Sequence, residues 1–468
     1  MTAPAASPSS AERPAGSSRL SPRPLDHRGS WATGGRFVGL TLLVYALARG
    51  VSALLLNVLT RYQVPVGWTG PRVDYFTIVG LWDAGWYREI AEHGYPATLP
   101  VDAAGQLQQS PWAFYPLFPF VTKAVMTVSG WPFAAAGSTV ALLLGGAAAV
   151  VIALQLRERV GARAGVAAVV VWSTCGPSPV LQVAYSESLA ILLLALVLWA
   201  LQKENWWAAA GLALFTGLAR PIAVPLAVVA LVAVAVRLRE RASRPVTRAE
   251  GGGMLASLAA CGLAGLTWPV VAWLDTGVPS AYTDTMATWR AGQHIQSLTP
   301  WVGVARYVFG SAGGPVALVV IIVLLVGVVT GPWASRLGPV LRAWCLAYPA
   351  YLAFVLDPGT SVFRYLVPLY PWAVIAVDGA WRSRREVSPS RERAVLAPAT
   401  TRPSLVDAHA LPPHEQGRTT SPAGGADVTL APRRVWGLTA VWVALGTATQ
   451  WWWLYELWRF VPPSDFPP

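Results

Sequence analysis

Apolar residues occur in long, almost uninterrupted runs along most of this chain, and short polar segments separate these runs. An apolar run of about 20 residues is long enough for an α-helix to cross a bilayer, so the pattern predicts an all-α polytopic membrane protein. We expect about eleven transmembrane helices, several of them short for a straight crossing. They are expected over residues 37–59, 134–156, 164–182, 188–202, 206–220, 221–236, 253–274, 313–332, 340–356, 365–380 and 435–457.

Composition divides the chain into regions. Residues 1–36 are rich in Pro, Ser and Ala and are predicted to form a disordered cytoplasmic tail. The apolar module covers residues 37–380, and residues 381–434 are predicted to form a disordered, basic cytoplasmic linker. A final transmembrane helix over residues 435–457 and an external tail over 458–468 complete this expected organisation.

The distribution of charge predicts the orientation. A cytoplasmic N-terminus places most of the 35 Lys and Arg residues on the cytoplasmic side, as the positive-inside rule requires. Residues 60–133 then form a large first external loop. We expect short interfacial helices there, including Pro111–Ser129, which prolines interrupt. The expected location is the cell membrane, with a bacterial cytoplasmic membrane favoured, and this orientation places several polar segments between the apolar runs at the external face.

Composition supports the membrane interpretation and argues against a soluble globular protein. The chain is 54% hydrophobic and 12% charged, and its mean hydropathy is +0.47. The net charge of +12 does not indicate a nucleic-acid partner, because the basic residues fall mainly in loops and tails. The three cysteines lie in apolar segments without metal-ligand spacing, and no nucleotide-binding motif is found. We predict no metal site and no cofactor, and leave a role for a divalent cation open.

The first external loop contains the most distinctive stretch, LWDAGWYREIAEHGY at Leu81–Tyr95. If Asp83 is the N-cap, residues 84–93 form a helix that Gly94 ends. Tyr87 then shares a helix face with Asp83. A carboxylate among aromatic rings could accept a proton from a sugar hydroxyl while the rings stack on the sugar. Asp83 could equally serve only as a helix cap, and the pattern does not decide between these two roles.

Four further charged residues lie in or beside apolar segments. Glu187 either complements the dipole of its helix or shares acid–base work with Asp83. Arg220 and Arg364 are either lipid-headgroup anchors or a clamp on a lipid-linked phosphate. Arg49 falls in the middle of the first predicted span, and we expect it to face the bundle interior rather than snorkel to the surface.

Two other groups are weaker candidates. Residues of the 275–312 loop could reach the same external site, although nothing in their spacing is specific: Asp284, Trp289, Arg290 and His294. The run Trp451–Trp453 is interpreted as an interfacial anchor.

Four short blocks along the chain have a recognisable order of residues. They are Trp82–Tyr87 with Ile90-Ala91 and Gly94-Tyr95, Phe114–Pro119, Ala184–Leu189, and Phe363–Tyr365 with Pro368. Together with Arg220 they resemble the PIG-V family, the GPI mannosyltransferase 2-like group of polytopic glycosyltransferases with the GT-C fold. The first block is fairly specific, and the others are suggestive only jointly. The resemblance covers roughly residues 37–380.

The resemblance implies a mannosyltransferase that uses a polyprenyl-phosphate sugar on the external face. Asp83 would deprotonate or orient the acceptor hydroxyl, with Glu187 as a second catalytic carboxylate. The residues expected to bind substrate are Trp82, Trp86, Tyr87, Tyr115, Tyr185, Ser186, Arg220, Arg364 and Tyr365. The expected partners are the lipid-linked donor, membrane lipids and a glycolipid, polysaccharide or protein acceptor. The alternatives are a transporter or flippase of lipid-linked sugars, which Arg49 favours, and a membrane scaffold without catalytic activity.

Overall fold

The structure is a computed structural model that describes residues 27–67, 69–290, 295–359, 361–380 and 432–462. Within these ranges the chain is helical and contains no β-strand beyond one isolated bridge. Five helical segments are long and apolar enough to cross a membrane: Gly34–Leu59, Phe133–Val160, Pro221–Arg239, Arg248–Thr276 and Gly313–Thr330. The prediction of an all-α protein is therefore confirmed for the described residues, and the five helical segments are candidate membrane spans.

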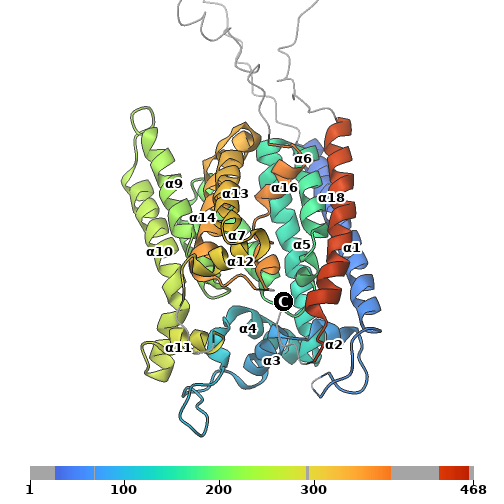
Figure 1. The fold of residues 1–468 in the computed structure, drawn as a ribbon. Coiled ribbons are helices and arrows are strands. Elements are labelled where there is room, and N and C mark those ends of the chain that lie inside the picture. Colours follow the sequence, from blue (N-terminus) through green and yellow to red (C-terminus); the bar gives the residue numbers. More distant parts are fainter. Residues whose placement is uncertain (1–26, 68, 291–294, 360, 381–431, 463–468) are drawn as a thin grey trace, which may run out of the picture.

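Long helices form an upright bundle (Figure 1). They are α1 (His27–Leu59), α5 (Phe133–Val160), α6 (Ala162–Thr174), α7 (Glu187–Gln202), α8 (Trp206–Gly217), α9 (Leu226–Arg239), α10 (Arg248–Thr276), α13 (Gly313–Thr330), α14 (Gly338–Val355) and α18 (Pro432–Trp453). The expected break between residues 206–220 and 221–236 is present, because α8 ends at Gly217 and the turn η3 (Pro221–Ala223) precedes α9.

Two expected spans are interrupted where prolines occur. Over residues 164–182 the helix α6 ends at Thr174, and a separate turn, η2 (Ser178–Leu181), follows Pro177. Residues 365–380 contain only the short helix α16 (Pro371–Ala376) rather than a continuous span. Proline cannot donate a backbone hydrogen bond inside a helix, so Pro368 and Pro371 account for this shorter element.

Short helices gather at one end of the bundle, where α2 (Tyr75–Val79), α3 (Asp83–His93), α4 (Leu117–Ser129) and α11 (Ala281–Thr288) lie together (Figure 1). The expected helix over residues 111–129 is divided by Pro116 into the turn η1 (Pro111–Ala113) and α4. A fifth short helix, α12 (Thr299–Phe309), packs against α13. The prediction of several short helices in the first loop is confirmed.

Arg49 faces the bundle interior, as expected, and its residue exposure is only 3%. Its guanidinium donates hydrogen bonds to the backbone oxygens of Ser173 and Ser178, and to Ser178 Oγ at 3.1 Å. These acceptors belong to the end of α6 and to η2. Arg49 therefore joins α1 to the segment that leads into α7.

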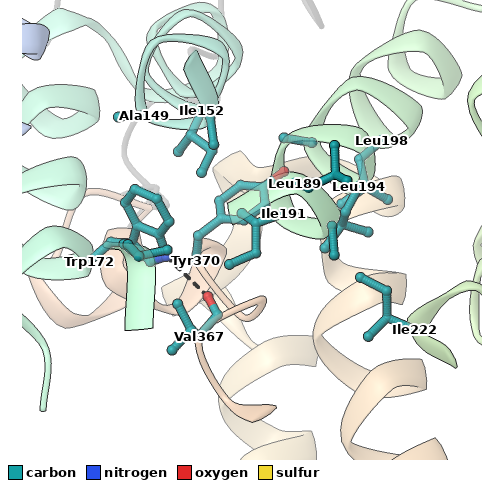
Figure 2. Close-up of a cluster of buried hydrophobic side chains, with 14 of the residues drawn as sticks. Ala149, Ile152, Trp172, Leu189, Ile191, Leu194, Leu198, Ile222, Val367 and Tyr370 are labelled. Atoms are coloured by element: carbon teal, nitrogen blue, oxygen red, sulfur yellow. Dashed lines mark hydrogen bonds between the residues drawn. The ribbon is translucent and has the colours of Figure 1, made fainter. Parts of the chain in front are cut away.

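A buried apolar cluster fixes the segment after α15 (Val362–Tyr365) against the bundle (Figure 2). Trp172 Nε1 donates a hydrogen bond to the backbone oxygen of Val367 at 3.0 Å, and the Tyr370 hydroxyl donates to Gln155 Oε1 at 2.5 Å. Leu189 and Ile191 of α7 lie in the same cluster. The packing thereby holds α15 close to the start of α7.

Candidate functional site

Four charged side chains from distant parts of the chain meet beside the layer of short helices. Arg364 Nη2 lies 2.6 Å from Asp83 Oδ2, and Arg364 Nη1 lies 3.1 Å from Glu187 Oε1. Arg220 Nη1 lies 2.5 Å from the same Glu187 oxygen. We call Asp83, Glu187, Arg220 and Arg364 the charge cluster. Its formal charges sum to zero.

Different backbone elements carry each member of the charge cluster. Asp83 and Glu187 are the first residues of α3 and α7, where a carboxylate is favoured by the helix dipole. Arg220 lies in extended backbone between α8 and η3, and Arg364 lies in α15. Gly217 allows α8 to approach α10 closely, since a Cβ there would lie 2.1 Å from the Ala264 carbonyl oxygen.

The prediction that Asp83 is the N-cap of its helix is wrong, although Gly94 ends the helix as expected. The N-cap position is occupied by Trp82, whose φ is +58°, and no side chain caps this end. Asp83 directs its carboxylate to Arg364 instead of to the backbone N–H groups of its own first turn. An ion pair with a residue far away in sequence thus replaces the local cap.

The two carboxylates differ in accessibility. The side chain of Glu187 is 2% exposed, whereas that of Asp83 is 15% exposed. Glu187 Oε2 is buried without a hydrogen-bond partner in the described structure. Asp83 uses Oδ2 for Arg364, and no partner for Oδ1 is found among the described residues. Asp83 is therefore the carboxylate with an oxygen open to a further ligand.

The electrostatics keep Arg364 cationic. Burial lowers its pKa, but the nearby Asp83 carboxylate, Tyr365 and Glu187 raise it more, so the pKa of Arg364 stands well above its ordinary value. The Tyr365 ring lies 5.0 Å from the guanidinium carbon of Arg364 and 5.2 Å from that of Arg220. Tyr365 thus supports both cations through its ring face.

Hydroxyl groups bind the edges of the charge cluster. The backbone N–H of Asp83 donates to the Tyr185 hydroxyl at 3.0 Å. The Tyr87 hydroxyl and Ser186 Oγ are 2.7 Å apart, and Arg220 Nη1 donates to Ser186 Oγ at 3.4 Å. Burial raises the pKa of Tyr185 well above its ordinary value and also raises the pKa of Tyr87, so both hydroxyls stay protonated.

A group of three aromatic rings adjoins the charge cluster through Trp86, which follows Asp83 by three residues on α3. The Trp86 and Phe114 rings are stacked with centroids 5.7 Å apart and planes 15° apart. Trp289, at the end of α11, meets both edge-on, at 5.6 Å and 5.8 Å. Trp86 was a predicted substrate-binding residue, whereas Phe114 was not proposed as a site residue.

The two remaining predicted substrate-binding residues, Tyr115 and Trp82, each bind a group outside the charge cluster. Tyr115 is buried in a neighbouring aromatic group, where its hydroxyl donates to that of Tyr282 at 3.2 Å. Trp82 donates its indole N–H to the backbone oxygen of Trp458 at 2.6 Å. Of the weaker candidates, Asp284 accepts from Ser280 and Arg290 pairs with Asp357, while His294 lies outside the described residues.

Trp458 lies beside the site although no sequence pattern predicted it there. It lies in η6 (Leu454–Trp458), a π-helical turn after α18, and its side chain is fully buried against Tyr185. The interfacial role expected for Trp451–Trp453 is wrong for Trp453, which is 1% exposed. A Trp five residues beyond an aromatic run was the only available sequence signal.

Metal binding finds no support in the charge cluster itself, where each carboxylate is paired with an arginine. Across the described part of the chain, no group of three or more His, Cys, Asp or Glu side chains is arranged to hold a metal ion. No protein-family model and no curated protein matches the chain.

Proposed function

We propose that the protein is a membrane glycosyltransferase that moves a hexose, with mannose as the first choice, from a polyprenyl-phosphate donor to an envelope acceptor. A GT-C fold with about eleven spans and an active site facing outside belongs to the same proposal. The observation that carries it is the ion pair between the partly exposed carboxylate of Asp83 and the buried Arg364. Glu187 joins Arg364 to a second buried arginine, Arg220. The motifs that resemble the PIG-V family include all four of these residues.

The chemistry assigned to this arrangement is an inverting displacement at the anomeric carbon. Asp83 Oδ1 accepts the proton of the acceptor hydroxyl as the hydroxyl oxygen forms its bond to the anomeric carbon. The bond from that carbon to the phosphate oxygen breaks, and the electron pair leaves with the lipid phosphate. Arg364 and Arg220 stabilise the charge that develops on this phosphate, for which a guanidinium offers paired N–H donors.

Glu187 receives a different role from the one expected. Its side chain is more deeply buried than that of Asp83, and one of its oxygens already accepts from both arginines. We therefore assign it to holding Arg220 and Arg364 beside each other, and not to proton transfer. The two guanidiniums would repel each other without a carboxylate between them.

The transporter alternative rested on a charge in the middle of the membrane. Nη1 and Nη2 of Arg49 donate to three oxygens of the bundle, and these bonds account for its burial, while Nε has no partner among the described residues. No other observation on the described residues favours a transporter over an enzyme.

The test is transfer in proteoliposomes that contain the purified protein, radiolabelled polyprenyl-phosphate mannose and a crude envelope-lipid extract. We expect label in a new product with the wild type, and a loss of about 10²–10⁴-fold with Asp83→Asn. Asp357→Asn is the matched control, since Asp357 pairs with Arg290 outside the charge cluster. A fully active Asp83→Asn variant would remove the proposed base, and label that crosses the bilayer unchanged would favour transport.

A further inference from the structure

The segment after α18 contains a π-helical turn and contacts residues that neighbour the charge cluster, Trp82 and Tyr185. In η6 the backbone N–H of Arg459 donates to the Leu454 oxygen, five residues back, at 3.0 Å. Such turns are rare and often occur at functional sites. The turn follows α18, which is separated in sequence from the preceding helices by residues 381–431.

The wider turn has a direct geometric effect on two tryptophans. In an α-helix, residues five apart point about 140° away from each other, at 100° per residue. In a π-turn the backbone hydrogen bond joins residues five apart, so residues at this spacing lie on nearly the same side. Trp453 and Trp458 therefore face the same side. Their ring centroids are 5.3 Å apart, and both side chains are buried. The turn therefore directs Trp458 into the protein rather than toward its surface.

Trp458 contacts both ends of the connection between α2 and α3. Its Nε1 donates to the backbone oxygen of Ile78 at 3.0 Å, and its own backbone oxygen accepts from Trp82 Nε1 at 2.6 Å. Its ring lies 5.2 Å from that of Tyr185, whose hydroxyl accepts the N–H of Asp83. Trp458 thus touches the residue before Asp83 and the side chain that binds the Asp83 backbone.

The backbone at Trp82 needs such support. Its φ of +58° is a conformation that bulky residues rarely adopt, and such strain persists only where surrounding contacts impose it. The indole of Trp82 is bound by Trp458 and also packs edge-on against Phe460, at 5.5 Å. Gln63, just beyond α1, holds Phe460 in turn through hydrogen bonds to its backbone N–H and C=O, each 2.9 Å long.

We propose that Trp458 is a positioning residue that fixes the backbone at Trp82 and thereby the direction of the Asp83 carboxylate. The inference rests on the proposed function only for its catalytic consequence, since the contact itself is independent of any reaction. It makes the segment after α18 part of the site.

The experiment compares three full-length variants. Trp458→Phe removes the N–H donated to Ile78, and Trp82→Phe removes the N–H donated to Trp458, which tests the same clamp from its other side. The control is Trp442→Phe on α18, which also removes an indole hydrogen bond to a backbone oxygen, that of Ala376 at 3.1 Å. Hydrogen–deuterium exchange of the peptide covering residues 78–90 is measured beside transfer kinetics.

We expect faster exchange in this peptide and a kcat about 10- to 100-fold lower for Trp458→Phe and Trp82→Phe, with an unchanged KM for the donor. Trp442→Phe should match the wild type in both measurements. Wild-type exchange in both site variants, or a changed exchange with an unchanged kcat, would overturn the proposal. If the wild type transfers nothing, the proposed function fails, and the exchange data alone decide whether Trp458 holds the start of α3.

Discussion

Arg364 Nη2 lies 2.6 Å from Asp83 Oδ2, so the carboxylate proposed as base and the guanidinium proposed to bind phosphate share one ion pair. The pair leaves one carboxylate oxygen for the acceptor hydroxyl. It also directs the planar guanidinium at two acids, because a second nitrogen of Arg364 reaches Glu187 at 3.1 Å. The shape of the arginine fork matters here as much as its charge.

Arg364→Lys should therefore be a severe change despite the conserved charge. An ammonium cannot contact Asp83 and Glu187 in the geometry that the guanidinium uses, so we expect kcat to fall about 10²–10³-fold. The control is Arg290→Lys, which affects a 3.2 Å contact to Asp357 and a 3.4 Å hydrogen bond to the Val355 backbone oxygen, both outside the charge cluster. Steady-state transfer from the polyprenyl-phosphate donor measures both. Equal activity of the two variants would argue against a role for Arg364 in binding phosphate.

Glu187→Gln should destabilise the fold as well as slow the reaction. It leaves two buried arginines with one carboxylate instead of two, and breaking a buried ion pair costs about 3–5 kcal/mol. Glu240→Gln is the control, since Glu240 is exposed and its contact with Arg244 is long, at 3.6 Å. Denaturant unfolding in detergent gives both values. A Glu187→Gln variant as stable as the control would show that Glu187 does not hold the arginines.

Local patterns in the sequence predicted the short helix that carries Asp83 and the inward orientation of Arg49, but not the cap of that helix. The polar stretch at residues 81–95 contains a short helix that ends at Gly94, and Arg49 faces inward. Spacing along one helix determines which residues share a face, but it does not determine the register between helices. The ion pair between Asp83 and Arg364 depends on that register, which is why the expected N-cap was not found.

Trp458 shows the same limit at longer range. Its burial depends on a π-helical turn, and a sequence pattern with a period of 3.6 residues gives no warning of an inserted residue. The interruption of the span expected over residues 365–380 could have been predicted from the sequence, because Pro368 and Pro371 both lie inside this span. The prediction of a continuous span relied on the apolar composition of this segment and did not take its prolines into account.

Arg49→Met should lower stability without changing substrate affinity. The variant leaves oxygens of Ser173 and Ser178 without their donor in a buried place, at about 1–3 kcal/mol for each unsatisfied group. Arg36→Met is the control, because Arg36 is exposed on the same helix, α1. Thermal unfolding and the donor KM are the measurements. A large rise in KM with normal stability would return Arg49 to the list of functional residues.

Trp86→Ala should weaken sugar binding. The variant removes the ring that stacks on Phe114 and adjoins Asp83, and the loss of one aromatic stacking contact predicts a KM about 3- to 10-fold higher. Trp131→Ala removes a 48% exposed ring from the loop after α4 and should leave KM unchanged. Kinetics at varied donor and varied acceptor concentrations show which substrate is affected. Unchanged KM values for both would assign Trp86 to packing alone.

The zero net charge of the cluster also bears on how the bundle is assembled. Asp83, Glu187, Arg220 and Arg364 come from four separate segments, and burying any one of them without its partners is costly. A bundle in which one segment has inserted wrongly retains an unpaired charge and is disfavoured against the correct one. The pairing of the residues proposed for chemistry thereby also favours the correctly assembled bundle over arrangements that leave one of these charges unpaired.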